Sequence, residues 1–414
     1  MGDCKTREVA NHQQATYREK KDASSALGIF ALLMMLAIAS HAQQTRVYRE
    51  GNTWVEEVSG TMPNAHELRV NTDLGSVQVQ GNAPRVSYVV RKRSYATTEA
   101  AARRQFEQMR VSAMKTGESD VLEGKLKPRN LSRFGAEFIL QVTREVGLVR
   151  VQTRNGSLAF ASIAASIVAT TGAGLIRLDD LTGPVKIASG GGNVEAGNLG
   201  SDLTLTSGAS DVHVANVSGH TQVSLEGGRV YIGSSRASTI QTGAGSIQVQ
   251  KCLGNLHVIS GGGNLYLGNV DGAVEAETEG GSVRLASATG PVRVTTGGGS
   301  VELHNLGSGA QVETGAGPIS VEFVGRGFTD SFLHTAAGDV TVCFANNLPV
   351  TVHATSDMAI GRGITSELPA LSNITKQGGE FSPKSVSAEG ALNGGGPALR
   401  IRTTIGQIVF RRCH

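Results

Sequence analysis

Aromatic residues, proline and cysteine are scarce in this 414-residue chain, and neither sign of charge dominates. The chain has one Trp, six Tyr and eleven Phe, with ten prolines and four cysteines. Such a low aromatic content fits a thin core between two walls, which has no room for large rings.

The charges are nearly balanced. Lysine and arginine total 38 against 35 aspartates and glutamates, which gives a net charge of +3. The two signs are mixed along the chain, so there is no basic stripe of the kind that holds phosphate backbones. We therefore expect no nucleic-acid partner.

Long hydrophobic runs are absent except for residues 26–39, which are apolar without interruption. Three basic residues precede this run, and Ser40-His41-Ala42 follows it with small residues at the −3 and −1 positions. The pattern predicts a signal peptide over 1–42, cleaved after Ala42, and hence an extracytoplasmic protein in the periplasm, the cell envelope or the medium. The alternative is an uncleaved membrane anchor, although a spanning helix needs about 20 residues.

Glycine is abundant, at 54 residues, and it marks a repeat of 18 residues. Eight of the nine intervals between successive markers are 18 residues long, and the interval from Gly228 to Gly245 is 17. Such a fixed period predicts that each repeat stacks on the next. The markers are Gly156, Gly174, Gly192, Ser210, Gly228, Gly245, Gly263, Gly281, Gly299 and Gly317.

Positions two and four residues after each marker are apolar in every repeat, and the position between them shares no chemistry. This alternation predicts a half-buried strand. The first inward positions are Leu158, Ile176, Val194, Val212, Val230, Ile247, Leu265, Val283, Val301 and Ile319. The second are Phe160, Leu178, Ala196, Val214, Ile232, Val249, Leu267, Leu285, Leu303 and Val321.

The same alternation recurs half a period later, as in Val185-Lys186-Ile187, so each repeat holds two short strands joined by two tight corners. One corner is glycine-rich, and the other carries an apolar residue seven positions after the marker, a position that Cys252 fills in one repeat. The predicted fold is all-β: a single parallel β-solenoid with 18-residue, two-strand coils. Nine or ten coils make a rod of roughly 45 to 50 Å.

The flanks differ from the repeats. We expect an N-terminal cap over 43–145, with strands near 67–70, 76–80, 85–90, 119–127 and 137–143 and one helix over 97–110 capped by Thr97 or Thr98. A further strand is expected near 147–153. The solenoid repeats are predicted over 146–345. The Gly-, Ser- and Pro-rich stretch within 346–396 predicts an irregular segment, and two closing strands are expected over 397–414.

Several phrases resemble those of a bacterial "putative adhesin" family of domains of unknown function, the DUF4097 type. The resemblance rests on the repeated Thr/Ser-Gly-x-Gly-Ser/Asn-Val/Ile phrases and on three further segments, and it covers roughly residues 60 to 412. It implies an exported or membrane-associated β-solenoid and transfers no binding site. The three segments are Thr335–Val342, Leu392–Pro397 and Ile401–Ile408.

The outward positions offer the candidate binding residues. One row places His213, Tyr231, Gln248, Tyr266, Arg284 and Glu302 in successive coils. Tyrosine beside arginine and glutamate can hold a sugar or a peptide, although a solvated face with an ordinary ion pair between Arg284 and Glu302 explains the same pattern. The spacing of carboxylates, histidines and glycines predicts no catalytic residue, no cofactor and no metal site.

Two cysteines near the C-terminus are candidates for a disulfide. If the closing strand stacks beside the strand that begins after Gly338, Cys343 and Cys413 are offset by two residues, near the limit of disulfide reach. Both the bond and two free thiols remain open from the sequence.

Three functions remain open at this point. The favoured one is a non-catalytic scaffold or adhesin-like binding module, whose partner is an envelope or surface component, a glycan or a protein. The alternatives are a carbohydrate-active lyase or glycosidase on a β-helix, and a sensor domain associated with the membrane through residues 26–39. The regular spacing between Gly156 and Gly317 leaves no long insertion to wall a catalytic cleft, which disfavours the enzyme.

Overall fold

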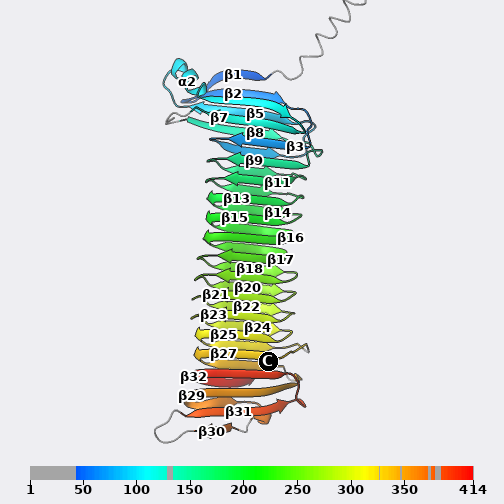
Figure 1. Cartoon of the computed structure of the whole chain (residues 1–414), viewed down its shortest axis with the longest axis vertical. Helices are drawn as coiled ribbons and strands as arrows, with labels where there is room; N and C mark the ends of the chain where they lie inside the picture. Colours follow the sequence, from blue (N-terminus) through cyan, green and yellow to red (C-terminus); the bar gives the residue numbers. More distant parts are fainter. Residues whose placement is uncertain are drawn as a thin grey trace, which may run out of the picture.

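A computed structural model describes residues 43–127, 134–325, 327–345, 347–371, 374–377 and 384–413. The strands stack one above another along a single long axis, with the N-terminal strands at one end and the C-terminal strands at the other (Figure 1). The predicted signal peptide and its cleavage site lie outside the described residues. Among the residues that are described, no helix is long and apolar enough to cross a membrane.

The stack is solenoid-like, with two ladders of parallel strands that we call wall A and wall B. Through most of each wall a residue pairs with the residue 18 positions later, as Ile176 does with Val194 in wall A and Val185 with Leu203 in wall B. The offset is 17 from Val230 to Ile247, and it is 21 near the C-terminal end, where Gln311 pairs with Phe332 and Ile319 with Val340. The 18-residue period is therefore the distance along the chain from one coil to the next. Four strands turn a corner and contribute to both walls, so all the strands join in one sheet.

The bounds of the strands are as follows. Wall A contains β10 (Leu158–Ala161), β12 (Ile176–Asp179), β14 (Val194–Leu199), β18 (Ile247–Cys252), β20 (Leu265–Val270), β22 (Val283–Ala288), β24 (Val301–Leu306), β26 (Ile319–Phe323) and β28 (Val340–Phe344). Wall B contains β9 (Leu148–Thr153), β11 (Ser166–Thr171), β13 (Val185–Gly191), β15 (Leu203–Ala209), β19 (Leu256–Ser260), β21 (Val274–Thr278), β23 (Val292–Thr296), β25 (Ala310–Ala316) and β27 (Ser331–Ala337). The strands shared by both walls are β16 (Val212–Gly227), β17 (Val230–Thr242), β29 (Val350–Ser366) and β32 (Ala398–Arg412).

The predicted alternation is confirmed, because all twenty inward positions of wall A are buried. The core between the walls is aliphatic and narrow. At the glycine-rich corners, buried hydroxyls donate hydrogen bonds to the carbonyls of marker glycines. Thr296 Oγ1 donates to the carbonyl of Gly281 at 2.8 Å, and Thr314 Oγ1 donates to that of Gly299 at 3.1 Å. A buried hydroxyl is costly when it has no partner, and these bonds supply the partner for the Thr that begins each of these glycine-rich phrases.

The marker glycines are required because successive coils touch there. A Cβ on Gly299 would collide with the backbone of Gly281, and a Cβ on Gly245 would collide with that of Gly228. Gly245 also has a φ of +126°, which side chains rarely adopt.

The 17-residue repeat shortens one corner. The pairing of β16 with β17 changes register between Val217 and His220, so the lost residue comes from the corner rather than from either strand. In the shorter coil the inward corner position is Ser235, which is buried and lies 2.6 Å from the Ser238 hydroxyl. Two hydroxyls that bond to each other thus stand where the neighbouring coils have the apolar side chains of Val217 and Cys252.

At the N-terminal end the coils are stacked out of chain order. The coil of β3 (Glu67–Thr72) and β4 (Ser76–Gln80) pairs with β9 and β10 on one side. On its other side lies a coil formed by β7 (Ser119–Leu126) and β8 (Phe134–Gln141). Antiparallel strands then cover this end, so the last coil does not present a bare edge.

The predicted cap strands and the Thr98 cap are found, but the helix α2 is shorter than expected, at Glu99–Phe106. Residues 109 and 110 instead begin a strand. The sequence analysis missed three strands here, β1, β2 and β6. The covering strands are β1 (Gln44–Glu50), β2 (Thr53–Thr61), β5 (Ser87–Ser94) and β6 (Met109–Thr116).

At the C-terminal end, too, the strands are stacked out of chain order. Strand β32 lies between β27 and β28 on one side and β29 on the other, so the last strand of the chain is inserted into the stack (Figure 1). The two closing strands expected over 397–414 are one continuous strand that turns a corner.

The irregular segment predicted over 346–396 is wrong. It contains the whole of the long strand β29, whose Val350, Val352 and Ala354 are buried, and β31 (Ser385–Leu392), which is antiparallel to β29 and pairs with it. The short η1 (Pro369–Leu371) and the exposed β30 (Ile374–Gln377) complete this end. The polar composition of the segment reflects a covering layer with one solvated face rather than a loop.

Candidate functional site

The predicted outward row lies in register on wall A, and we call it the tyrosine row. It consists of one residue from each of β16, β17, β18, β20, β22 and β24. Each is flanked by two inward residues, so the pleat directs it to solvent. The paired residues are His213 with Tyr231, Tyr231 with Gln248, Gln248 with Tyr266, Tyr266 with Arg284, and Arg284 with Glu302.

The two ends of the tyrosine row differ in their contacts. The rings of His213 and Tyr231 stack with centroids 4.5 Å apart and planes 2° from parallel. At the other end, Arg284 Nη2 lies 2.6 Å from Glu302 Oε2. Between them Tyr266 is 44% exposed, and its hydroxyl accepts a hydrogen bond from Asn264 Nδ2 at 3.2 Å. The structure thus joins rings, an amide and an ion pair in one straight row.

Two shallow hollows follow this row. The first has a volume of about 360 Å³, and the second of about 250 Å³. Tyr266 and Gln248 line both, so the hollows adjoin. His213 and Tyr231 belong to the first, and Arg284 belongs to the second.

A charged pair forms one side of the first hollow. Arg229 Nη2 lies 2.7 Å from Asp211 Oδ2. The hydrogen bond from this guanidinium, helped by the backbone N–H of Arg229, lowers the pKa of Asp211 below its usual value. The pKa of Arg229 is raised by the same contact. The hollow therefore keeps both a carboxylate acceptor and a guanidinium donor beside the rings.

Wall B carries a larger groove that the sequence analysis did not identify. Its volume is about 470 Å³, and polar groups of His257, Glu275, Arg293 and Gln311 line it. His257 Nδ1 lies 2.9 Å from Glu275 Oε2. The sequence did contain a signal for this groove, because a column of mostly small residues recurs every 18 residues beside His257, Glu275, Arg293 and Gln311. These positions are Ala237, Asn255, Ala273, Pro291 and Gly309.

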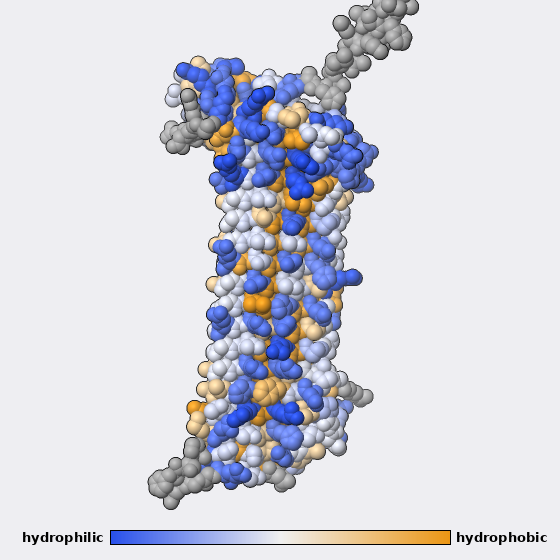
Figure 2. Space-filling model, viewed as in Figure 1, coloured by the Kyte–Doolittle hydropathy of each residue, from blue (hydrophilic) through white to orange (hydrophobic). Residues whose placement is uncertain are grey.

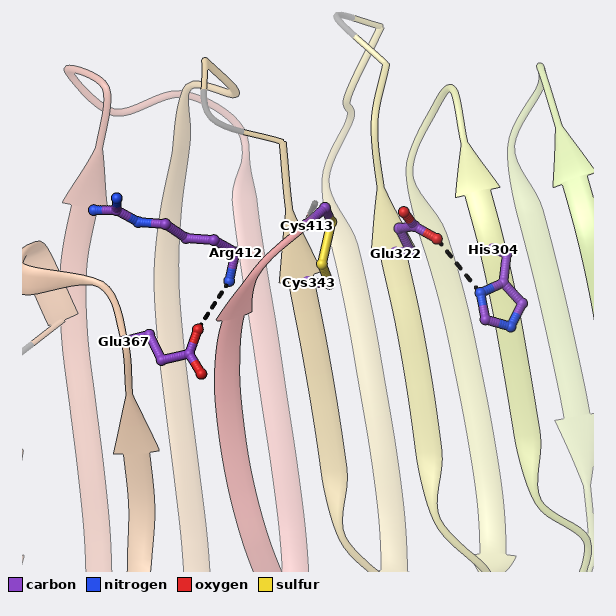
Figure 3. The surroundings of a disulfide bond; sticks show 6 residues. All are labelled: His304, Glu322, Cys343, Glu367, Arg412 and Cys413. Carbon is purple, nitrogen blue, oxygen red and sulfur yellow. Dashed lines mark hydrogen bonds and ion pairs between the residues drawn. A yellow bond between two sulfur atoms is a disulfide. The ribbon is translucent and has the colours of Figure 1, made fainter.

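The structure joins Cys343 and Cys413 in a disulfide, with Cα atoms 5.3 Å apart (Figure 3). Cys343 pairs with Arg411 in the β28–β32 ladder, so the offset of two residues anticipated from the sequence is present. The chain past β32 remains beside β28, because the N–H of Cys413 donates to the carbonyl of Phe344 at 3.2 Å. Cys252 is buried with a free thiol.

Potential metal ligands meet at one place among the described residues. The side chains of Glu322, Cys343 and Cys413 each offer a ligand atom, and these atoms lie within 4.8 Å of one another. The spacing of these residues in the sequence predicts no metal site, and the two cysteines were expected only as a possible disulfide pair.

The sequence matches no family model and no curated protein. Three solved structures are similar to parts of it. A putative adhesin from Parabacteroides distasonis is 12% identical over 70% of this chain and 95% of its own, with a TM-score of 0.27. A putative lipid binding protein from the same organism is 12% identical over 71% and 97%, with a TM-score of 0.24. A putative cell adhesion protein from Clostridium sporogenes is 9% identical over 90% and 100%, with a TM-score of 0.17.

Proposed function

We propose that this protein is an exported, non-catalytic β-solenoid of the "putative adhesin" type whose tyrosine row binds an extended glycan of the cell envelope. The observation that carries the proposal is the row itself. Rings, an amide and an ion pair lie in line along one wall, next to two adjoining hollows.

The chemistry of the row suits a sugar chain. Tyrosine rings pack on the C–H faces of sugars, while amides, carboxylates and guanidinium groups bond to hydroxyls. Tyr231 and Tyr266 stand two coils apart, about 10 Å, which is comparable to the length of a disaccharide unit. A polymer lying along the rod would therefore pass Tyr231 and Tyr266 about one disaccharide unit apart.

The rod is built to hold that row without rearrangement. Each outward residue sits between two buried ones, so its direction is set by the core on which the strand packs. Binding would then order few side chains and no backbone, which reduces the entropic cost of association.

A binding screen with a matched pair of variants tests the proposal. The chain from residue 43 to 414 is applied to immobilised envelope polysaccharides and to a glycan array. Tyr231→Ser combined with Tyr266→Ser should weaken binding at least tenfold, because two stacking contacts are lost. His257→Ser combined with Arg293→Ser changes the wall B groove and should leave the affinity within twofold.

The opposite pattern of affinities would place the glycan-binding site on wall B. If the wall B variant lost binding and the tyrosine variant kept it, the glycan would lie in the groove of wall B. If the protein released shorter sugars from a bound polysaccharide, it would be a carbohydrate-active enzyme and not a binding module.

Export is the remaining part of the proposal, and it rests on the apolar run at 26–39 and the small residues before position 43. Mass spectrometry of the protein from fractionated cells should find an N-terminus at Gln43 outside the cytoplasm. An intact N-terminus in the membrane pellet would support the membrane-associated sensor instead.

A further inference from the structure

One column of outward side chains on wall A crosses the last coils before the C-terminal end. It contains His304 on β24, Glu322 on β26 and Cys343 on β28, and Cys413 joins it from the residue after β32 (Figure 3). Glu322 pairs directly with Cys343 in the ladder. Strands far apart in the chain therefore bring an imidazole, a carboxylate and two sulfur atoms to one place.

The ligand atoms of Glu322, Cys343 and Cys413 lie within 4.8 Å of one another, and all three residues are half-buried. His304 Nδ1 lies 3.4 Å from Glu322 Oε2, on the side away from the disulfide (Figure 3). In a tetrahedral zinc site, bond lengths of about 2.0 to 2.3 Å place neighbouring ligand atoms roughly 3.3 to 3.8 Å apart. To reach this spacing the two sulfur atoms, which are bonded to each other in the disulfide, must move apart, and the Glu322 carboxylate oxygen already lies within 4.8 Å of both.

We propose that, once the disulfide is reduced, Cys343, Cys413 and Glu322 bind one Zn²⁺ ion, with His304 as the positioning residue that orients the Glu322 carboxylate. Two thiolates with one carboxylate form a ligand set that suits a borderline-soft divalent cation better than calcium or magnesium. A ligating carboxylate is itself usually held by a hydrogen bond, which is the part His304 plays here.

The change from the disulfide to the zinc site balances chemically when an external dithiol is the reductant. Thiol–disulfide exchange breaks the Cys343–Cys413 bond, and the dithiol becomes a disulfide while two electrons and two protons pass to the cysteines. Zinc binding then displaces the two thiol protons to solvent. The same pair of residues thus ties the end of β32 to β28 in either state, by a covalent bond or through the metal.

The position of the pair at the end of the ladder makes both states accessible. Cys413 lies one residue beyond the end of β32, so its sulfur can move from bonding distance to ligand spacing without breaking the paired part of the strand. The Cys413 N–H bond to the Phe344 carbonyl keeps the backbone beside β28.

Cobalt binding to the 43–414 chain tests the proposal, because tetrahedral thiolate–cobalt sites have their own charge-transfer and ligand-field absorption. The reduced chain, freed of reductant under argon, should bind one equivalent of Co²⁺, and Zn²⁺ should displace it. The oxidised chain should show none of these bands. Cys413→Ser should abolish the thiolate band.

Two further variants separate ligation from a general effect of folding. Glu322→Gln should weaken binding at least tenfold, and His304→Ala should weaken it about tenfold. Asp179→Asn, a carboxylate change on the same wall but outside the tyrosine row, should have no effect, and circular dichroism checks that each variant is folded. Equal cobalt binding by the oxidised chain, or unchanged affinity in folded Glu322→Gln, would overturn the proposal.

Discussion

The middle coils and the two ends of this rod are built on different rules. In the middle, each strand pairs with the strands one coil earlier and one coil later, which are 18 residues away in the chain, or 17 at the shortened coil. At the ends, β3 and β4 stack on β9 and β10, and β32 enters between β28 and β29, so neighbours in space are far apart in sequence. The middle is therefore specified by a local repeat, and the ends depend on closing long loops.

The cores differ in the same way. Between Ala161 and Glu322 the sequence has no Phe or Trp, and the inward positions are aliphatic. At the C-terminal end Phe344 stacks between Phe323 and Phe410, with centroids 6.2 Å apart on each side. Phe138 and Phe106 are buried at the other end. Large rings are therefore buried toward the two ends of the stack, and the middle coils, all of whose residues are described, bury none.

The surfaces differ as well. Strongly hydrophilic residues crowd the N-terminal end, whereas the middle coils show mostly residues of intermediate hydropathy (Figure 2). Charged pairs join the covering strands there, such as Lys92 Nζ with Glu56 Oε2 at 2.6 Å and Arg91 Nε with Glu57 Oε2 at 3.1 Å. Charged side chains on the last strands protect a sheet from pairing edge to edge with another molecule.

The largest expected effect is a charge in the middle core. Leu267 is 3% exposed, so Leu267→Asp would bury an unpaired carboxylate and should destabilise the chain by roughly 3 to 5 kcal/mol. Tyr266→Ser, one residue away and facing outward, should stay within about 0.5 kcal/mol. Urea unfolding of both variants checks this, and the reverse order would mean that the register of wall A is inverted.

A smaller effect is expected from the disulfide, and it should stay at one end. The bond closes a loop of 70 residues, and losing it through Cys413→Ser should cost about 2 to 4 kcal/mol. Hydrogen exchange should accelerate in β28, β29 and β32 and remain unchanged in β14 to β22. Uniform acceleration along the rod would show that the C-terminal end is not a separate unit of stability.

A still smaller effect separates two adjacent glycines of one corner. Gly299→Ala should destabilise the middle by roughly 1 to 3 kcal/mol, because its Cβ would meet the Gly281 backbone. Gly298→Ala meets no atom within 4 Å and should be nearly neutral. Equal melting temperatures for the two variants would contradict the close contact between coils.

The smallest effect concerns acid at the N-terminal end. Hydrogen bonds from Arg69, then Ser119 and Arg150, lower the pKa of Glu67 to about 2, against burial that raises it. Because the folded value lies below the unfolded value near 4.5, the stabilisation is complete above pH 4.5 and is lost as the pH falls toward 2. Glu67→Gln should flatten the pH dependence of hydrogen exchange in β3 over that window. An unchanged slope would exclude this carboxylate as its source.

The sequence predicted the regular part of the molecule well, because its period and its alternation are local properties. It placed the strands of the middle coils, the inward positions and the members of the tyrosine row. It missed β1, β2 and β6 and misjudged 346–396, since a covering strand has one solvated face and carries no repeat. The wall B groove was missed because concavity depends on how the corners are shaped, and the meeting of Glu322 with Cys343 and Cys413 required knowing where β32 is inserted.

The central claim is that the middle coils are interchangeable units held between two fixed ends. The most direct test of this claim is to delete one whole coil. Removing residues 264–281 takes out β20 and β21 and joins Gly263 to Ser282 in register. We predict a folded chain with one cooperative transition, unaltered exchange at both ends and the Cys343–Cys413 bond still formed. Removing only residues 264–272 should unfold it, because that deletion exchanges the walls. If the 18-residue deletion were as disruptive as the nine-residue one, the coils would not be equivalent units and the account would be contradicted.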